Sequence, residues 1–172
     1  MSLYTRSFFA ACLLIFAFCA IAPVQSAAQT VAPSSGKALC SALTPADFTK
    51  AGIPVSGLGQ ANLDGNDGAY CVYKSQAGKV EFDIFFPAGA NPKEVDATEK
   101  TVLGEGGCRH ESLRLAGADD AQLCLAMPDL KDSSSIVVRK GKAVFDIVIP
   151  KGAKARQQLM DLAQIVLSRL KK

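Results

Sequence analysis

Hydrophobic and polar residues alternate along several short segments from position 70 onward, which is the period of strands with one buried face. In the segment 79–86 every even position is apolar, while Lys79, Glu81 and Asp83 occupy odd positions. We therefore expect one face of this strand to contact a core and the other to face water. The same period predicts strands over 70–75, 79–86, 108–115, 122–127, 135–139 and 142–149.

Helical signals occupy three other segments. A short helix is bounded by Thr44 as its N-cap, by a proline at the first helical position and by Gly52 at its end. A second helix is predicted over 92–103. A third is predicted over 153–170, where apolar residues recur on one face at helical spacing. The intervening residues 53–68 are rich in glycine and asparagine, and we expect a loop there.

An internal repeat is the most informative pattern in the chain. The sequence GKVEFDIFFPAGA over 78–90 matches GKAVFDIVIPKGA over 141–153 at 8 of 13 positions, with a constant offset of 63. In each copy a strand follows a hairpin turn, ends at a proline and precedes a predicted helix. We therefore predict an α+β fold, an antiparallel sheet with helices packed on one face, built from a duplicated hairpin-plus-helix unit. Asp83 and Asp146 are equivalent in the repeat, and both are expected at exposed strand positions.

The first 28 residues have the pattern of a signal peptide. Arg6 supplies the positive charge, the apolar run 8–22 follows, and the small residues Ser26 and Ala28 precede the predicted cut. Cleavage after Ala28 is the first expectation and cleavage after Ser26 the second. The run is shorter than the roughly 20 residues of a membrane anchor, and Phe18 stands where a lipobox needs a small residue. The predicted organisation is a signal peptide over 1–28, a flexible leader over 29–38 and one domain over 39–172, with no stable membrane span after cleavage.

Cleavage leaves four cysteines in the mature chain, an even number that suggests two disulfides in a periplasmic or secreted protein. Two strand-like runs flank a turn near Gly117, which places Cys108 and Cys124 opposite each other across a hairpin. We therefore predict a disulfide between Cys108 and Cys124, leaving Cys40 to pair with Cys71. A zinc site or a redox pair is the alternative, but the chain has no Cys-x-x-Cys spacing.

Composition and charge narrow the class of partner. The chain has 172 residues, of which 49% are apolar and 20% charged, and its formal net charge is +3, which excludes an intrinsically disordered chain. Residues 29–130 carry 8 basic and 13 acidic side chains (net −5), whereas residues 131–172 carry 10 basic and 3 acidic ones (net +7). The basic section either contacts an anionic envelope component or an acidic protein, or packs against the acidic section of the same domain. Nucleic acid is not expected as a partner. The candidate basic contact surface consists of Arg139, Lys140, Lys142, Lys151, Lys154 and Arg156.

Candidate catalytic and ligand-binding motifs are few. His110, the only histidine, has no nucleophile motif beside it, so we predict no catalytic residue. The segment 62–70 (NLDGNDGAY) lacks the spacing of oxygen ligands in an EF-hand. GLGQAN and GEGG lack the complete glycine patterns of phosphate-binding loops. We expect all three segments to be turns or loops, and we predict no metal site and no cofactor.

The order of CSALTPADFTKAGI, CVYKS, a glycine-linked pair of strands and a final LMDLAQIVLSRL helix resembles small exported or lipoprotein-type domains of the bacterial envelope. The likeness covers about residues 39–170, and its motifs are a Cys-x-x-Leu-Thr opening and a Cys-x-Tyr strand. The resemblance implies a noncatalytic α+β domain located in the envelope. It also implies a disulfide between the first two mature cysteines.

Three functional hypotheses follow. The first is an exported, noncatalytic binding or accessory domain of the cell envelope that recognises a protein or an envelope component. The alternative is a carrier of an apolar small molecule or lipid, which needs a deep apolar cavity. The second alternative is a hydrolase of an unrecognised type, which needs a cleft that brings His110 close to an acid and a nucleophile.

Overall fold

The computed structural model describes residues 36–64, 68–86, 91–130 and 132–170. The chain divides into the units Met1–Thr30 and Val31–Lys172, and the described residues all belong to the second. The predicted signal peptide, its cleavage site and most of the predicted leader therefore lie outside the described residues. The first described helix begins at Gly36, three residues before the predicted start of the domain at Leu39.

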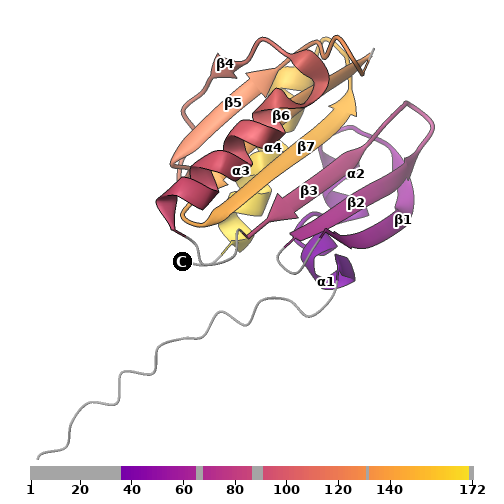
Figure 1. The fold of residues 1–172 in the computed structure, drawn as a ribbon. Helices are drawn as coiled ribbons and strands as arrows, with labels where there is room; N and C mark the ends of the chain where they lie inside the picture. Colours follow the sequence, from indigo (N-terminus) through magenta and orange to yellow (C-terminus); the bar gives the residue numbers. More distant parts are fainter. Residues whose placement is uncertain (1–35, 65–67, 87–90, 131, 171–172) are drawn as a thin grey trace, which may run out of the picture. The chain divides into compact units, whose positions relative to one another are not determined.

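Seven strands of the described chain form one antiparallel sheet in the order β1-β2-β3-β7-β6-β5-β4 (Figure 1). After β3, the chain runs through α3 to the far edge of the sheet and returns strand by strand to β7, which pairs with β3. The elements are α1 (Gly36–Cys40), α2 (Pro45–Lys50), β1 (Val55–Asp64), β2 (Gly68–Ser75), β3 (Glu81–Phe85), α3 (Pro92–Gly104), the short 3-10 turn η1 (Glu105–Gly107), β4 (Glu111–Ser112), β5 (Asp120–Cys124), β6 (Ser133–Lys140), β7 (Ala143–Pro150) and α4 (Ala155–Arg169).

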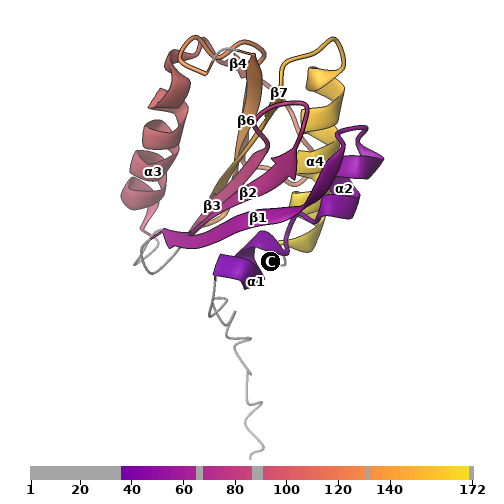
Figure 2. The ribbon, with the colours of Figure 1, turned by 90° about the vertical axis from the view of Figure 1, so that its right-hand side faces the viewer.

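Helices cover both faces of the sheet, and Figure 2 shows α3 and α4 on opposite sides of it. The larger core lies on the α4 side, where Phe82, Phe145 and Ile147 are fully buried beneath α4 together with residues of α1 and α2. The smaller core lies on the other side, where Val95 and Val102 of α3 pack on valines of β6 and β7. The alternation along β7 sends neighbouring residues to the two cores.

The predicted antiparallel α+β fold with two disulfides is confirmed. The prediction that the helices pack on one face is wrong, because α3 lies alone on the face opposite α4. The predicted loop over 53–68 is also wrong over most of its length, since Val55–Asp64 forms β1 and contains the GLGQAN segment. This strand pairs with β2 through its backbone and carries two irregularities near Gly57 and Gly59, so its side chains give little alternation. The predicted strand over 108–115 is reduced to Glu111–Ser112.

The strands of the two repeat copies lie side by side at the centre of the sheet. β3 pairs with β7 so that Asp83 is directly opposite Asp146, and the register is symmetric about this pair. A two-fold axis through the pair would keep the following helices on one face, but α3 and α4 occupy opposite faces. The structure therefore does not show a duplicated hairpin-plus-helix unit.

Two disulfides join neighbouring parts of the fold. Cys40 of α1 is bonded to Cys71 of β2, with Cα atoms 5.7 Å apart. Cys108 is bonded to Cys124 at the end of β5, with Cα atoms 6.1 Å apart. Both pairs agree with the prediction. Each bridge is expected to stabilise the fold by roughly 3 kcal/mol through loop entropy.

A bidentate ion pair holds α4 against α2. Arg169 donates to the two carboxylate oxygens of Asp47 at 2.6 and 2.9 Å. The backbone N–H of Thr44 donates to the same carboxylate at 2.8 Å, which caps the predicted helix at the predicted residue. Burial alone would raise the pKa of Asp47, but the hydrogen bonds from Arg169 and Thr44 lower it to about 2.

Candidate functional site

A small acidic cleft lies between the sheet and the end of α3. Its floor is built from neighbouring strands: Tyr70 on β2 pairs with Asp83 on β3, which in turn pairs with Asp146 on β7. Glu81 lies two residues before Asp83 and therefore on the same face. Four polar side chains from three adjacent strands thus converge on one surface of the sheet.

Apolar side chains form the walls of this acidic cleft. Val102 of α3, Met127 and Leu130 of the segment after β5, and Val148 of β7 line it together with Ser135 and Val137 of β6. Its volume is about 100 Å³. Lys79 and Glu105 stand among the lining residues as well.

The turn η1 helps to shape this part of the molecule. Gly106 has a φ of +72°, and a Cβ atom at this position would overlap the terminal methyl group of Met127. Gly107 has a φ of +62°. Both glycines therefore allow a turn that other residues would strain. The GEGG segment is a turn, as predicted. It lies beside Met127, which lines the acidic cleft.

Hydrogen bonds and an ion pair satisfy Glu81, although its exposed fraction is only 4%. The hydroxyl of Tyr70 donates to its Oε1, and Lys79 Nζ lies 2.7 Å from its Oε2. The hydrogen bond to Glu81 and burial both raise the pKa of Tyr70, so its hydroxyl remains a donor. Lys79 is thus ion-paired with Glu81, and its charge also lowers the pKa of both aspartates, although burial and the neighbouring carboxylates outweigh this effect.

Asp83 and Asp146 are held in a setting that disfavours their charged forms. Burial, followed by the charge of Glu81, raises the pKa of Asp83 to about 7, against the lowering effect of one hydrogen bond from the backbone N–H of Cys71 at 3.3 Å. Burial and the neighbouring Asp83 raise the pKa of Asp146 well above its ordinary value. The pair therefore retains a proton near neutral pH.

Asp146 is the most unusual member of the acidic cleft. Its exposed fraction is 8%, and within the described part of the chain no hydrogen bond or ion pair reaches its carboxyl. A buried carboxyl without a partner is costly, because burial removes its water without supplying another donor. Asp146 lines the acidic cleft, so a group that enters the cleft can supply the donor that the described residues do not.

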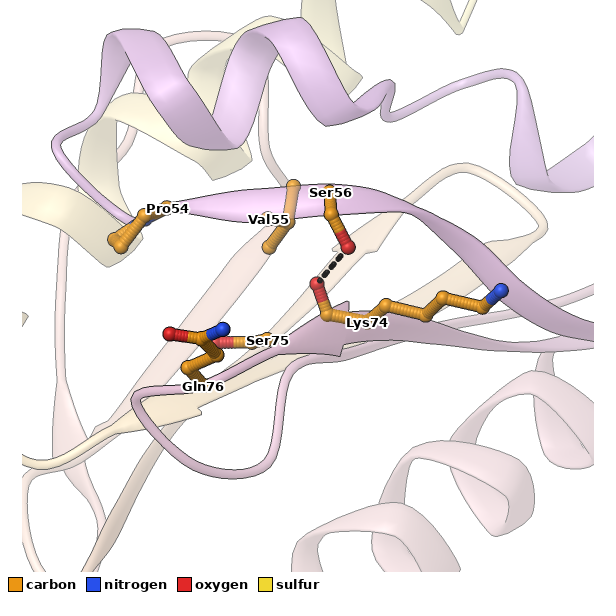
Figure 3. A pocket seen from close by; sticks show the side chains of 6 residues that line it. All are labelled: Pro54, Val55, Ser56, Lys74, Ser75 and Gln76. Carbon is orange, nitrogen blue, oxygen red and sulfur yellow. Dashed lines mark hydrogen bonds between the residues drawn. The ribbon is translucent and has the colours of Figure 1, made fainter.

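A second, larger depression lies at the start of β1 and the end of β2. It has a volume of about 560 Å³ and is lined by Pro54, Val55, Ser56, Lys74, Ser75 and Gln76. Figure 3 shows the first three facing the last three, with Ser56 donating to the backbone oxygen of Lys74 at 3.4 Å. Its lining comes from two neighbouring strand ends and presents more apolar than polar surface, and the depression is open to solvent.

No known relative guides the assignment of either cavity. Comparison of the chain with protein-family models, curated protein sequences and solved structures gave no match. The chemistry of the acidic cleft must therefore be argued from its own residues.

The six residues of the candidate basic contact surface do not gather in one place. Arg139 forms ion pairs with Asp96 and Glu99 of α3, at 2.8 and 3.4 Å. Lys140 donates to the backbone oxygens of Leu167 and Leu170 at the end of α4. The remaining members, Lys142, Lys151, Lys154 and Arg156, fall at the two ends of β7, and Arg156 is paired with Glu111. An eight-residue strand separates these ends by about 26 Å.

His110 lies in the segment between η1 and β4 and is half-buried. Burial lowers its pKa, partly offset by a hydrogen bond with the backbone of Cys108. Among the described residues, no hydroxyl, thiol or carboxylate hydrogen-bonds to its ring. The structure thus places His110 apart from Asp83 and Asp146, which belong to the acidic cleft.

The described residues contain no group of three or more histidine, cysteine or acidic side chains arranged to hold a metal ion. The predicted loop over 62–70 is divided between the end of β1, the undescribed residues 65–67 and the start of β2. None of the helices in the described part is both long enough and apolar enough to cross a membrane.

The acidic cleft was not predicted from the sequence, and the expected exposure of Asp83 and Asp146 is wrong. Asp146 is buried and Asp83 is half-buried, because α3 and the segment around Met127 cover their face of the sheet. One signal was present in the sequence. The repeat places an aspartate between apolar residues at the same position of two strands, and antiparallel pairing of these strands would bring the aspartates together.

Proposed function

We propose that the chain is an exported, noncatalytic binding domain of the bacterial cell envelope, which recognises a protein or another envelope component. Export is supported by the leader pattern of residues 1–28 and by two disulfides, which persist in oxidising compartments. The binding role rests on one observation, the buried and unpartnered carboxyl of Asp146 in the acidic cleft. Such a group is tolerated where a ligand supplies the missing partner.

The alternatives have less support. A carrier of an apolar molecule needs a deep apolar cavity, whereas the larger depression is open to solvent and lies between two neighbouring strand ends. A hydrolase needs His110 to meet a carboxylate and a nucleophile, and the described residues offer no such contact. The basic residues also give less support than expected, because Arg139, Lys140 and Arg156 already bind partners within the domain.

Affinity capture from an envelope extract tests this proposal. The immobilised protein, with both disulfides intact, should retain one or more components that Asp83→Asn, Asp146→Asn double-variant protein does not retain. Asp161→Asn is the matched control, because Asp161 is an exposed carboxylate of α4 on the opposite side of the sheet. Identical capture by all three proteins, or no capture at all, would argue against the proposal. Co-purified lipid in place of a protein would favour the carrier.

A further inference from the structure

The acidic cleft has an unbalanced set of charges. Lys79 is the cation among its lining residues and is paired with Glu81, and no ion pair of the described residues reaches Asp83, Asp146 or Glu105. The charge of Glu105 raises the pKa of both aspartates. A site with four acidic side chains and one lysine attracts a further positive group.

The size of the acidic cleft limits the kind of cation. Its volume of about 100 Å³ equals that of about three water molecules, which leaves room for an ammonium head and one or two methylene groups. A guanidinium group is planar and wider, and it needs acceptors spread along its edge. Because the described residues provide no metal-ligand arrangement, the geometry does not favour a divalent ion.

The lining suits a charged head joined to an aliphatic chain. Carboxyls of β3 and β7 form the floor, and Val102, Met127 and Leu130 provide apolar surface beside them. An ammonium head has three donors, which matches acceptors on Asp83 and Asp146. Its methylene groups would contact the walls and remain out of water.

We propose that the acidic cleft binds a primary alkylammonium group, presented either by a lysine side chain of a protein partner or by a free aliphatic amine. This inference rests on the proposed binding function and names the chemistry that it recognises. Binding of the cation favours release of the proton that the two aspartates retain near neutral pH, because the ammonium charge stabilises the carboxylate that this proton neutralises. Affinity must then rise with pH while the amine stays protonated.

The probe is n-butylammonium, titrated into the protein expressed with its own leader and purified with both disulfides intact. At about pH 8 we expect saturable amide NMR shifts in β2, β3 and β7, and at about pH 5.5 an affinity lower by about tenfold or more. Calorimetry in two buffers with different ionisation heats should detect proton release. Methylammonium should bind more weakly than n-butylammonium, and uncharged n-butanol should not bind.

The variants separate a binding role from a structural one. Asp146→Asn and Asp83→Asn should each weaken n-butylammonium binding by about tenfold or more, whereas Asp161→Asn should bind as wild type does. If Asp146→Asn does not fold, Asp83→Asn and the pH series on the wild-type protein still decide the matter. Binding of Nα-acetyl-lysine amide would indicate a lysine side chain as the natural ligand, and binding of n-butylammonium alone would indicate a free amine.

Three results would overturn the inference: no saturable shift with any ammonium probe, an affinity independent of pH, or equal or tighter binding of Nα-acetyl-arginine amide or Ca²⁺. These results leave the proposed function testable on its own. If capture of an envelope component depends on the acidic cleft but no ammonium probe binds, ammonium recognition is rejected and the proposed binding function is retained. Loss of both would reject the binding domain as well.

Discussion

We predict that Asp83 makes the fold less stable as the pH rises toward neutrality. Its pKa is raised from 3.8 to about 7 by burial and by Glu81. The folded state therefore binds this proton more tightly than the unfolded chain does. The stability that comes from this proton is complete below about pH 4 and is lost as the pH rises through about 7.

The size of the effect follows from the two pKa values. Each factor of ten in proton affinity corresponds to about 1.4 kcal/mol, so the free energy of unfolding should decrease by on the order of 4 kcal/mol across this range. The opposite effect of Asp47, whose pKa is lowered to about 2, is confined to more acidic solutions. The two carboxyls therefore act in separate pH windows.

Urea unfolding at about pH 4.5, about pH 6 and about pH 7.5 measures this decrease. In Asp83→Asn one of the two aspartates is gone and Asp146 remains, so the decrease should be smaller than in wild type and the variant should gain stability over wild type as the pH rises. Asp161→Asn should keep the wild-type slope, because this carboxylate is exposed and accepts a hydrogen bond from the side chain of Gln157 at 2.7 Å. A wild-type free energy of unfolding that rises across the window, or a slope unchanged in Asp83→Asn, would refute the reasoning.

Other changes test the packing around the cores. Arg169→Ala should lower the free energy of unfolding by about 1 to 2 kcal/mol, because it removes a bidentate, partly buried pair; Arg156→Ala, which breaks an exposed pair, should cause no measurable change by the same urea assay. Gly106→Ala should lower the thermal midpoint, at a cost of about 1 to 3 kcal/mol, because of its positive φ and the overlap with Met127, whereas Gly104→Ala has free space and should be neutral. Peptide mapping without a reductant should recover the two disulfides described above, and a link between one cysteine of each pair would contradict the fold.

Much of the sheet can be predicted because its central strands alternate. Phe82 and Ile84 are apolar, buried and on one face, and α4 supplies a regular apolar side against them. β1 escapes prediction because it is an edge strand with glycines and two irregularities, whose pairing with β2 depends on backbone hydrogen bonds. The pattern of apolar and polar side chains does not indicate pairing that depends on the backbone.

The acidic cleft escapes prediction for a different reason. Charged residues at alternate positions of a strand normally face water, and Glu81 and Asp83 follow that pattern. Which face a crossover helix covers is decided by tertiary packing: α3 places Val95 and Val102 over β6 and β7 on the same side as the aspartates. Local periodicity identifies a strand with two unlike faces, but it does not say that both are covered.

The order of the disulfides along the chain bears on how the protein matures. Each of the four cysteines in the described part of the chain is bonded to its neighbour in the sequence, Cys40 to Cys71 and Cys108 to Cys124, with separations of 31 and 16 residues. If these four cysteines are oxidised in the order in which an exported chain emerges, Cys40 and Cys71 pair before Cys108 is available. Vectorial oxidation then gives the native bonds directly, without a later exchange of disulfides. Neither disulfide of the described residues crosses the boundary between β3 and β7. The two parts of the sheet on either side of this boundary can therefore each form with their own disulfide and then pair through β3 and β7, where Asp83 lies opposite Asp146.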